Sequence, residues 1–79
     1  MDADINVFAS NLRYLREASG LSLRDVAVHT GISKSLLHKY ETGKSDPTLK
    51  KIKVLANYFN ADINWLVGES ESKRLKKDA

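Results

Sequence analysis

The sequence predicts an all-α fold, a compact domain of five short helices, and three observations lead to this prediction. Apolar residues recur at steps of three and four along most of the chain, which is the spacing of one helix face. Serine, threonine and aspartate stand where helices can begin, and glycine, asparagine and proline stand where they can end. No stretch alternates apolar and polar residues in the manner of a strand. With 79 residues, the chain can build one small core and leaves no room for a separate catalytic domain.

The first helix is expected to run to about Ala18, with Asp2 or Asp4 as its cap. Gly20 ends it. Its inward face is predicted to consist of the residues spaced at helical intervals, Ile5, Phe8, Leu12 and Leu15.

A second helix is predicted to begin after Ser22, because Ser22 and Asp25 have the spacing of a capping box. Gly31 can adopt a positive φ at low cost, so it ends this helix in a sharp turn. The two features define a helix of about eight residues.

The third helix is predicted to begin after Ser33 as N-cap, and Ile32 and Leu37 are placed to pack on each other across its start. Leu37 then belongs to the inward face, together with Leu36 and Tyr40. The outward face contains no acid, and Glu41 lies at its boundary. It consists of Lys34, Ser35, His38, Lys39 and Thr42. Two such helices joined by a short turn with a glycine are typical of the helix-turn-helix motif, whose second helix enters the major groove of DNA.

A loop with the only proline, Pro47, separates the third helix from a fourth that Thr48 or Asp46 can cap. The apolar face of the fourth helix is predicted to consist of Leu49, Ile52, Leu55, Ala56 and Phe59, and Asn60 ends it. Asp62 is expected to cap a fifth, short helix over residues 63–67 that ends at Gly68.

Three further apolar residues, Val54, Tyr58 and Trp65, exceed what one small core needs. They either form a surface for a partner or, in the case of Trp65, cover the core. The folded domain is expected to span residues 1–68. The segment 69–79 is polar and charged, so we predict that it is a disordered tail.

Positive charge is concentrated in the middle of the chain, although the net charge is only +3. Residues 33–53 contain six lysines and two acids, whereas the segments before and after them are close to neutral. A local patch of this kind indicates a polyanionic partner, and its simpler interpretation is an exposed, solubilising face.

Other classes of protein find little support in the sequence. The chain has no cysteine, and its two histidines, His29 and His38, fall on different predicted helices. No motif of a metalloenzyme or of a phosphate-binding loop occurs, so neither catalysis nor a metal or cofactor is expected. No apolar run reaches the ~20 residues of a membrane span, so the expected location is the cytoplasm.

The segment LRYLREASGLSLRDVAVHTGISKSLLHKYETGKSDPTLKKIKVLANYFNADINWLVG resembles the lambda-type phage repressor and Cro family of helix-turn-helix proteins, also called the Xre type. The resemblance covers about residues 10–68. It rests on elements in the order of the family, among them LR..RE, GLS, A...GIS, YE.GK, P.L and DINWLVG.

The resemblance implies a lambda-repressor-like domain that binds an inverted repeat in operator DNA, usually as a homodimer, and regulates transcription. The positions that read base edges fall on Lys34, Ser35, His38 and Lys39. Phosphate contacts fall on Leu23 and Arg24 through their backbone N–H groups, and on Ser33, Thr42 and Lys44. Arg16 and Glu41 correspond to a structural ion pair between the first helix and the end of the third.

One residue departs from the family pattern, because Leu23 stands where glutamine is common. Leucine can neither bind a phosphate nor support the first base-reading residue, Lys34. By the same analogy, the dimer surface is expected around Trp65 and the loop from Lys44 to Pro47.

Small domains of this family also serve as antitoxins, so an interaction module that holds a protein partner through the tail 69–79 is the alternative function. The operator sequence, the choice between repressor and activator, and the inducing signal stay open at this point.

Overall fold

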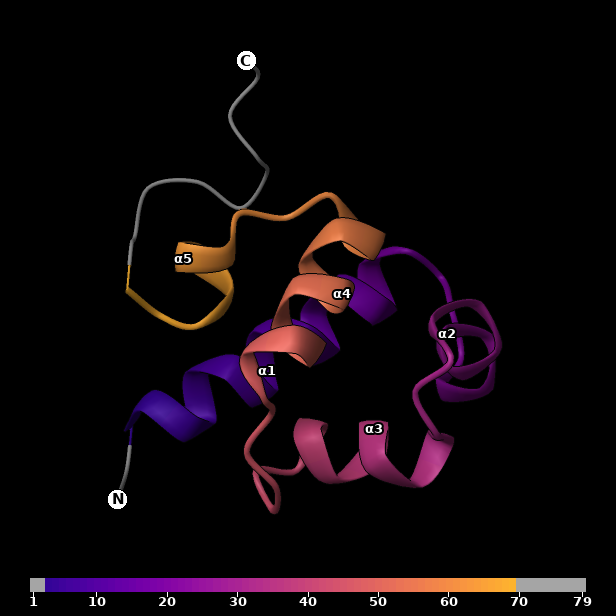
Figure 1. Ribbon diagram of the computed structural model, residues 1–79, viewed down its shortest axis with the longest axis horizontal. Helices are drawn as coiled ribbons and strands as arrows, with labels where there is room; N and C mark the ends of the chain where they lie inside the picture. The colour runs from indigo at the N-terminus through magenta and orange to yellow at the C-terminus, as the bar shows by residue number, and fades with distance from the viewer. Residues whose placement is uncertain (1–2, 70–79) are drawn as a thin grey trace.

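The computed structural model describes residues 3–69, and within them the chain forms five helices and no strand (Figure 1). The helices are α1 (Ala3–Ala18), α2 (Leu23–Thr30), α3 (Lys34–Glu41), α4 (Leu49–Phe59) and α5 (Ile63–Leu66). The predicted all-α class and the order of the five helices are confirmed. Asp4, the other predicted cap, lies inside α1, because the helix begins at Ala3. Asp2 as a cap, the side chain of Ile5 and the predicted tail beyond Glu69 lie outside what the structure describes.

Side-chain caps fix where four of the helices begin. The Ser22 hydroxyl accepts from the Asp25 N–H at 3.0 Å, and the Asp25 carboxylate accepts from the Ser22 N–H at 2.9 Å, so the predicted capping box is present. Hydrogen bonding by Ser22, first of all from its backbone N–H, stabilises the Asp25 carboxylate and lowers the pKa of this carboxyl. Ser33, Thr48 and Asp62 are the N-caps of α3, α4 and α5, and the side chain of each accepts one backbone N–H bond.

Left-handed residues end the helices where the sequence predicted them. Gly31 closes α2 with a φ of 77°, and Asn60 closes α4 with a φ of 54°. Gly68, just after α5, combines a φ of 86° with close packing, because a Cβ there would lie 2.8 Å from Val7 Cγ1. Only glycine lets the chain pass α1 at this point.

Each helix contributes one large, almost completely buried side chain to a single core. These side chains are 0 to 1% exposed, and they are Leu12, Val26, Leu37, Leu55 and Leu66, from α1 to α5 in turn. Burial of such a side chain stabilises the fold by about 1.5–3 kcal/mol. The three surplus residues Val54, Tyr58 and Trp65 are half-buried and pack against this core.

The prediction for Leu49 was wrong. We expected it on the buried face of α4, but its side chain is 63% exposed. Leu49 is the first residue of α4 and directly follows the loop, so it precedes the part of the helix that packs on the core, where Leu55 and Ala56 are buried.

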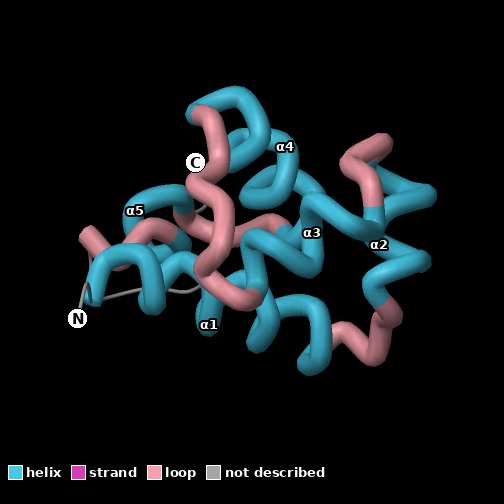
Figure 2. The backbone as a smooth tube through the Cα atoms, turned by 90° about the horizontal axis from the view of Figure 1, so that it is seen from below, coloured by secondary structure: helices cyan, strands magenta, loops and turns pink. Residues whose placement is uncertain are grey.

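The packing leaves α3 at one edge of the molecule, on a side away from α5. α5 packs on α1 and α4, whereas α3 packs on α1 and α2 (Figure 1). Figure 2 views the molecule from below, where α3 and the loop that follows it lie. The outward face of α3 is therefore open to a partner along its length.

Candidate nucleic-acid interface

The two faces of α3 differ sharply in exposure. Leu37 and Tyr40 are 1% and 3% exposed and face the core. The side chains of Lys34, Ser35, His38 and Lys39, the four predicted base-reading residues, are exposed on the opposite face. Burial raises the pKa of the Tyr40 hydroxyl, so that group stays neutral. One face of α3 thus packs on the core, and the opposite face is exposed and can contact a partner.

An open hollow of about 550 Å³ brings the predicted base-reading residues together with two of the predicted phosphate contacts. The lining residues are Leu23, Lys34, Ser35, His38, Lys39 and Lys44. Three of them are lysines and none is an acid, so the surface attracts anions. A helix that presents such a face matches the width of the DNA major groove.

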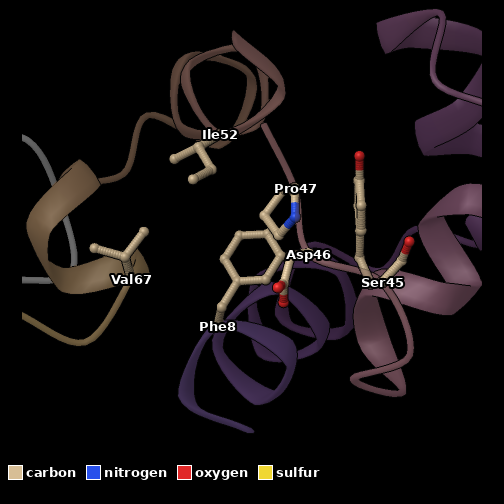
Figure 3. A pocket seen from close by; sticks show the side chains of 7 residues that line it. Phe8, Ser45, Asp46, Pro47, Ile52 and Val67 are labelled. Carbon is tan, nitrogen blue, oxygen red and sulfur yellow. The ribbon is translucent and has the colours of Figure 1, made fainter. Parts of the chain in front are cut away.

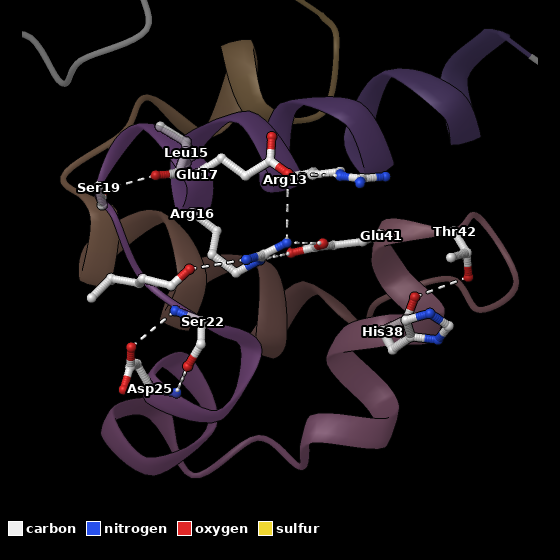
Figure 4. Close-up of polar contacts among 11 residues, drawn as sticks. Arg13, Leu15, Arg16, Glu17, Ser19, Ser22, Asp25, His38, Glu41 and Thr42 are labelled. Carbon is white, nitrogen blue, oxygen red and sulfur yellow. Dashed lines mark hydrogen bonds and ion pairs between the residues drawn. The ribbon is translucent and has the colours of Figure 1, made fainter.

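The two hydroxyl groups predicted to bind phosphate differ in what they can still offer. The Ser33 hydroxyl accepts from the Leu36 N–H at 3.0 Å, and its own proton remains available to an oxygen outside the domain. The Thr42 hydroxyl instead donates to the His38 carbonyl at 2.9 Å, so its proton is already used (Figure 4). Ser33 is therefore the better donor of the two.

The first turn of α2 supplies backbone donors beside this hollow. The Ser22 side chain and carbonyl occupy the N–H groups of Asp25 and Val26. Within the described part of the chain, the N–H groups of Leu23 and Arg24 have no acceptor. Free N–H groups at the positive end of a helix are suited to bind an anion.

Arg16 ties α1 to the end of α3 through a bidentate ion pair (Figure 4). Its Nε donates to Glu41 Oε2 at 2.7 Å and its Nη2 donates to Glu41 Oε1 at 3.0 Å. A third bond, from Nη1 to the Leu21 carbonyl at 2.9 Å, includes the turn before α2. The hydrogen bond with Glu41 raises the pKa of Arg16. One side chain thus fixes the position of α3 relative to both α1 and α2.

Two polar contacts that the sequence analysis missed hold other helices in place. His29 Nδ1 lies 2.6 Å from the Tyr58 hydroxyl and joins α2 to α4. Asn11 Nδ2 donates to the Trp65 carbonyl at 3.0 Å and joins α1 to α5. The partners are 29 and 54 positions apart, and no local pattern in the sequence indicates such pairs.

A second hollow, of about 220 Å³, lies on another part of the surface (Figure 3). Its lining is mostly apolar and comes from α1, the end of α3, the loop before α4, α4 itself and the turn after α5. The lining residues are Phe8, Tyr40, Ser45, Asp46, Pro47, Ile52 and Val67. The exposed Leu49 lies between two of them in the sequence.

Among residues 3–69, no three histidine, cysteine or acidic side chains gather in a way that could hold a metal ion. None of the helices in this part of the chain is both long and apolar enough to cross a membrane.

A family model described as helix-turn-helix matches residues 12–66 of the chain. An uncharacterized HTH-type transcriptional regulator of Coxiella burnetii is 36% identical over 62 residues, which are 77% of this chain and 29% of that protein. The cryptic phage CTXphi transcriptional repressor RstR of Vibrio cholerae is 33% identical over 66 residues, which are 84% of this chain and 60% of the repressor. The chain thus spans less than two thirds of these relatives.

Among solved structures, the restriction-modification controller protein C.AhdI from Aeromonas hydrophila is similar over nearly its whole length. The TM-score is 0.75 and the sequence identity 32%, and the similarity covers 82% of this chain and 98% of the controller protein.

Proposed function

The chain belongs to the helix-turn-helix family, and we propose that it is a sequence-specific DNA-binding transcriptional regulator, a dimeric repressor of the phage repressor and Cro type. One observation carries the proposal: four exposed polar side chains of α3 line a hollow together with Lys44 and with Leu23 of α2. None of the residues that line this hollow is acidic. Helix-turn-helix regulators are DNA-binding proteins rather than enzymes, so we assign no reaction.

Base reading is proposed for the exposed face of α3. Lys34 and Lys39 can donate to guanine O6 and N7, Ser35 suits several bases, and His38 can donate or accept. Each good contact discriminates against a wrong base by about 1–3 kcal/mol.

Phosphate binding is proposed for groups at the edges of this face. The free N–H groups of Leu23 and Arg24, the Ser33 hydroxyl and the Lys44 ammonium are all placed to donate. Thr42 joins them only if its hydroxyl gives up the bond to the His38 carbonyl. Such contacts position the protein on DNA without specifying sequence.

A homodimer would place two copies of α3 in successive major grooves, about 34 Å apart, on an inverted repeat. The apolar hollow that includes Pro47 and Val67, together with the exposed Leu49 two residues after Pro47 in the sequence, supports a contact between two copies on this side. In a twofold contact, Leu49 of each copy meets the same surface of the other copy.

The deciding experiment is an in vitro selection from random duplex DNA at about 0.15 M salt, since weak non-specific binding fades at that salt concentration. We expect enrichment of one inverted repeat whose half-site centres lie about one helical turn apart. If no sequence is enriched, specific DNA recognition is contradicted, and a module that binds a protein partner becomes the better description.

Three lysine variants then separate base contacts from phosphate contacts. Lys34→Ala and Lys39→Ala should reduce the preference for the operator over random DNA. Lys44→Ala should weaken binding to the operator and to random DNA by the same factor. It should also lower the slope of log affinity against log salt by about 1. Equal losses on both DNAs for all three variants would contradict the base-reading assignment.

For its location, we propose the nucleoid in the cytoplasm, where an operator would be found.

A further inference from the structure

Leu23 occupies an unusual place in the hollow that faces DNA. It is the first residue of α2, and its side chain is half-buried against the core. Its remaining surface lines the hollow together with Lys34 and the rest of the exposed face of α3. Among the described lining residues, Leu23 alone has an aliphatic side chain.

A leucine side chain offers no hydrogen bond to a phosphate or to a polar base edge. Its contribution to binding depends on apolar surface that leaves water when the two molecules meet. The major groove offers one apolar group among the base edges, the C5 methyl of thymine. Leu23 is therefore complementary to the methyl group of thymine, whereas a lysine is complementary to the hydrogen-bond acceptors of guanine.

Local structure holds Leu23 rigidly enough for this role. The capping box of Ser22 and Asp25 fixes the first turn of α2, and the contact of Leu23 with the core restricts its side chain. A restricted side chain loses little conformational entropy on binding.

We propose that Leu23 is a specificity-determining residue that contacts the C5 methyl of one thymine in each half-site, at or next to the base pair that Lys34 contacts. The inference rests on the proposed function, because it assumes an operator in the hollow. It adds α2 to the sequence-reading surface, whereas the proposed function gives α2 only phosphate contacts.

The test uses the operator obtained by selection and replaces its thymines one at a time with deoxyuridine, which lacks only this methyl group. For each protein variant, fluorescence anisotropy gives the ratio of the affinities for the thymine and the deoxyuridine operator. This ratio is independent of any loss of stability, because both measurements use the same protein. For the wild type we expect one position per half-site where the ratio is about 4, the value for one methyl group.

Variants of Leu23 assign the effect to this side chain. Leu23→Met keeps an apolar side chain of similar volume and should keep the ratio above about 2. Leu23→Ala should bring the ratio at that position close to 1. Val28→Ala is the matched control, because Val28 is on the same helix, is 72% exposed and is not part of the hollow; its ratio should equal that of the wild type.

Two results would overturn the inference while leaving the proposed function intact: an operator in which no thymine is sensitive to deoxyuridine, or a sensitivity that persists in Leu23→Ala. Failure to select any operator would instead overturn the proposed function.

Discussion

Two arginines three positions apart on α1 show how strongly the surroundings decide the value of an ion pair. Arg13 pairs with Glu17 on the outer face, where the side chains are 59% and 56% exposed, through one bond of 3.1 Å. Arg16 pairs with Glu41 at the junction of α1 and α3, where they are 15% and 6% exposed. Water screens the first pair and solvates its members when they separate, but Glu41 has little access to water. We therefore expect the exposed pair to be dispensable for stability and the pair of Arg16 and Glu41 to be needed.

The largest expected effect comes from breaking the buried pair. Arg16→Met should lower the free energy of unfolding by about 3 kcal/mol, because it leaves the Glu41 carboxylate without its partner and also removes a bond to the Leu21 carbonyl. Urea unfolding followed by circular dichroism measures the loss. Arg13→Met is the matched control, and equal stability of the two variants would contradict the comparison.

A double variant separates the value of the pair from the cost of an unpaired charge. Arg16→Met combined with Glu41→Met removes both charges and replaces them with apolar groups, so it should be more stable than Arg16→Met alone. We expect a coupling energy of about 2 kcal/mol in the double-mutant cycle. Additive losses would mean that the carboxylate is well solvated without Arg16.

The exposed capping box, unlike the two ion pairs, is expected to contribute to stability in a way that depends on pH. Because hydrogen bonds from Ser22 lower the pKa of Asp25 in the folded state, its carboxylate stabilises the fold above its ordinary pKa, and this stabilisation is lost as the pH falls through the folded value. The stability difference between the wild type and Asp25→Ala should therefore shrink between neutral pH and about pH 2. A difference that stays constant over this range would show that the carboxylate charge adds nothing to the cap.

The smallest effect is expected at the exposed pair. Arg13→Met should cost at most about 0.5 kcal/mol, the usual value for a pair four residues apart on a helix. That cost should disappear at about 1 M salt, where charges are screened within ~3 Å. A larger loss of stability, or a loss that does not depend on salt, would show that the Arg13–Glu17 pair behaves like the buried pair and would contradict the comparison.

Local chemistry explains why the helix limits could be predicted from the sequence. Ser22, Ser33 and Thr48 each act on N–H groups no more than three residues away, so the signal and its effect lie together in the chain. Gly31 and Asn60 likewise end helices through their own backbone conformation.

Properties that depend on how the helices pack could not be predicted in this way. Helical spacing placed Leu49 on an apolar face, but it could not show that the core begins further along α4. The bond from Asn11 to the Trp65 carbonyl joins residues 54 positions apart. The sequence shows Leu23 only as a departure from the family pattern, whereas the fold places its side chain in the lining of the hollow.

Trp65 provides the protein with an intrinsic optical probe of one junction. It is the single tryptophan of the chain, its ring meets Tyr14 edge-on with centroids 6.4 Å apart, and its carbonyl accepts the bond from Asn11. Its fluorescence therefore reports whether α5 stays docked on α1, whereas circular dichroism averages over all the helices. If both signals change together on denaturation, the four-residue α5 leaves only when the whole core melts. An earlier change in fluorescence would identify α5 as a cooperative unit of its own.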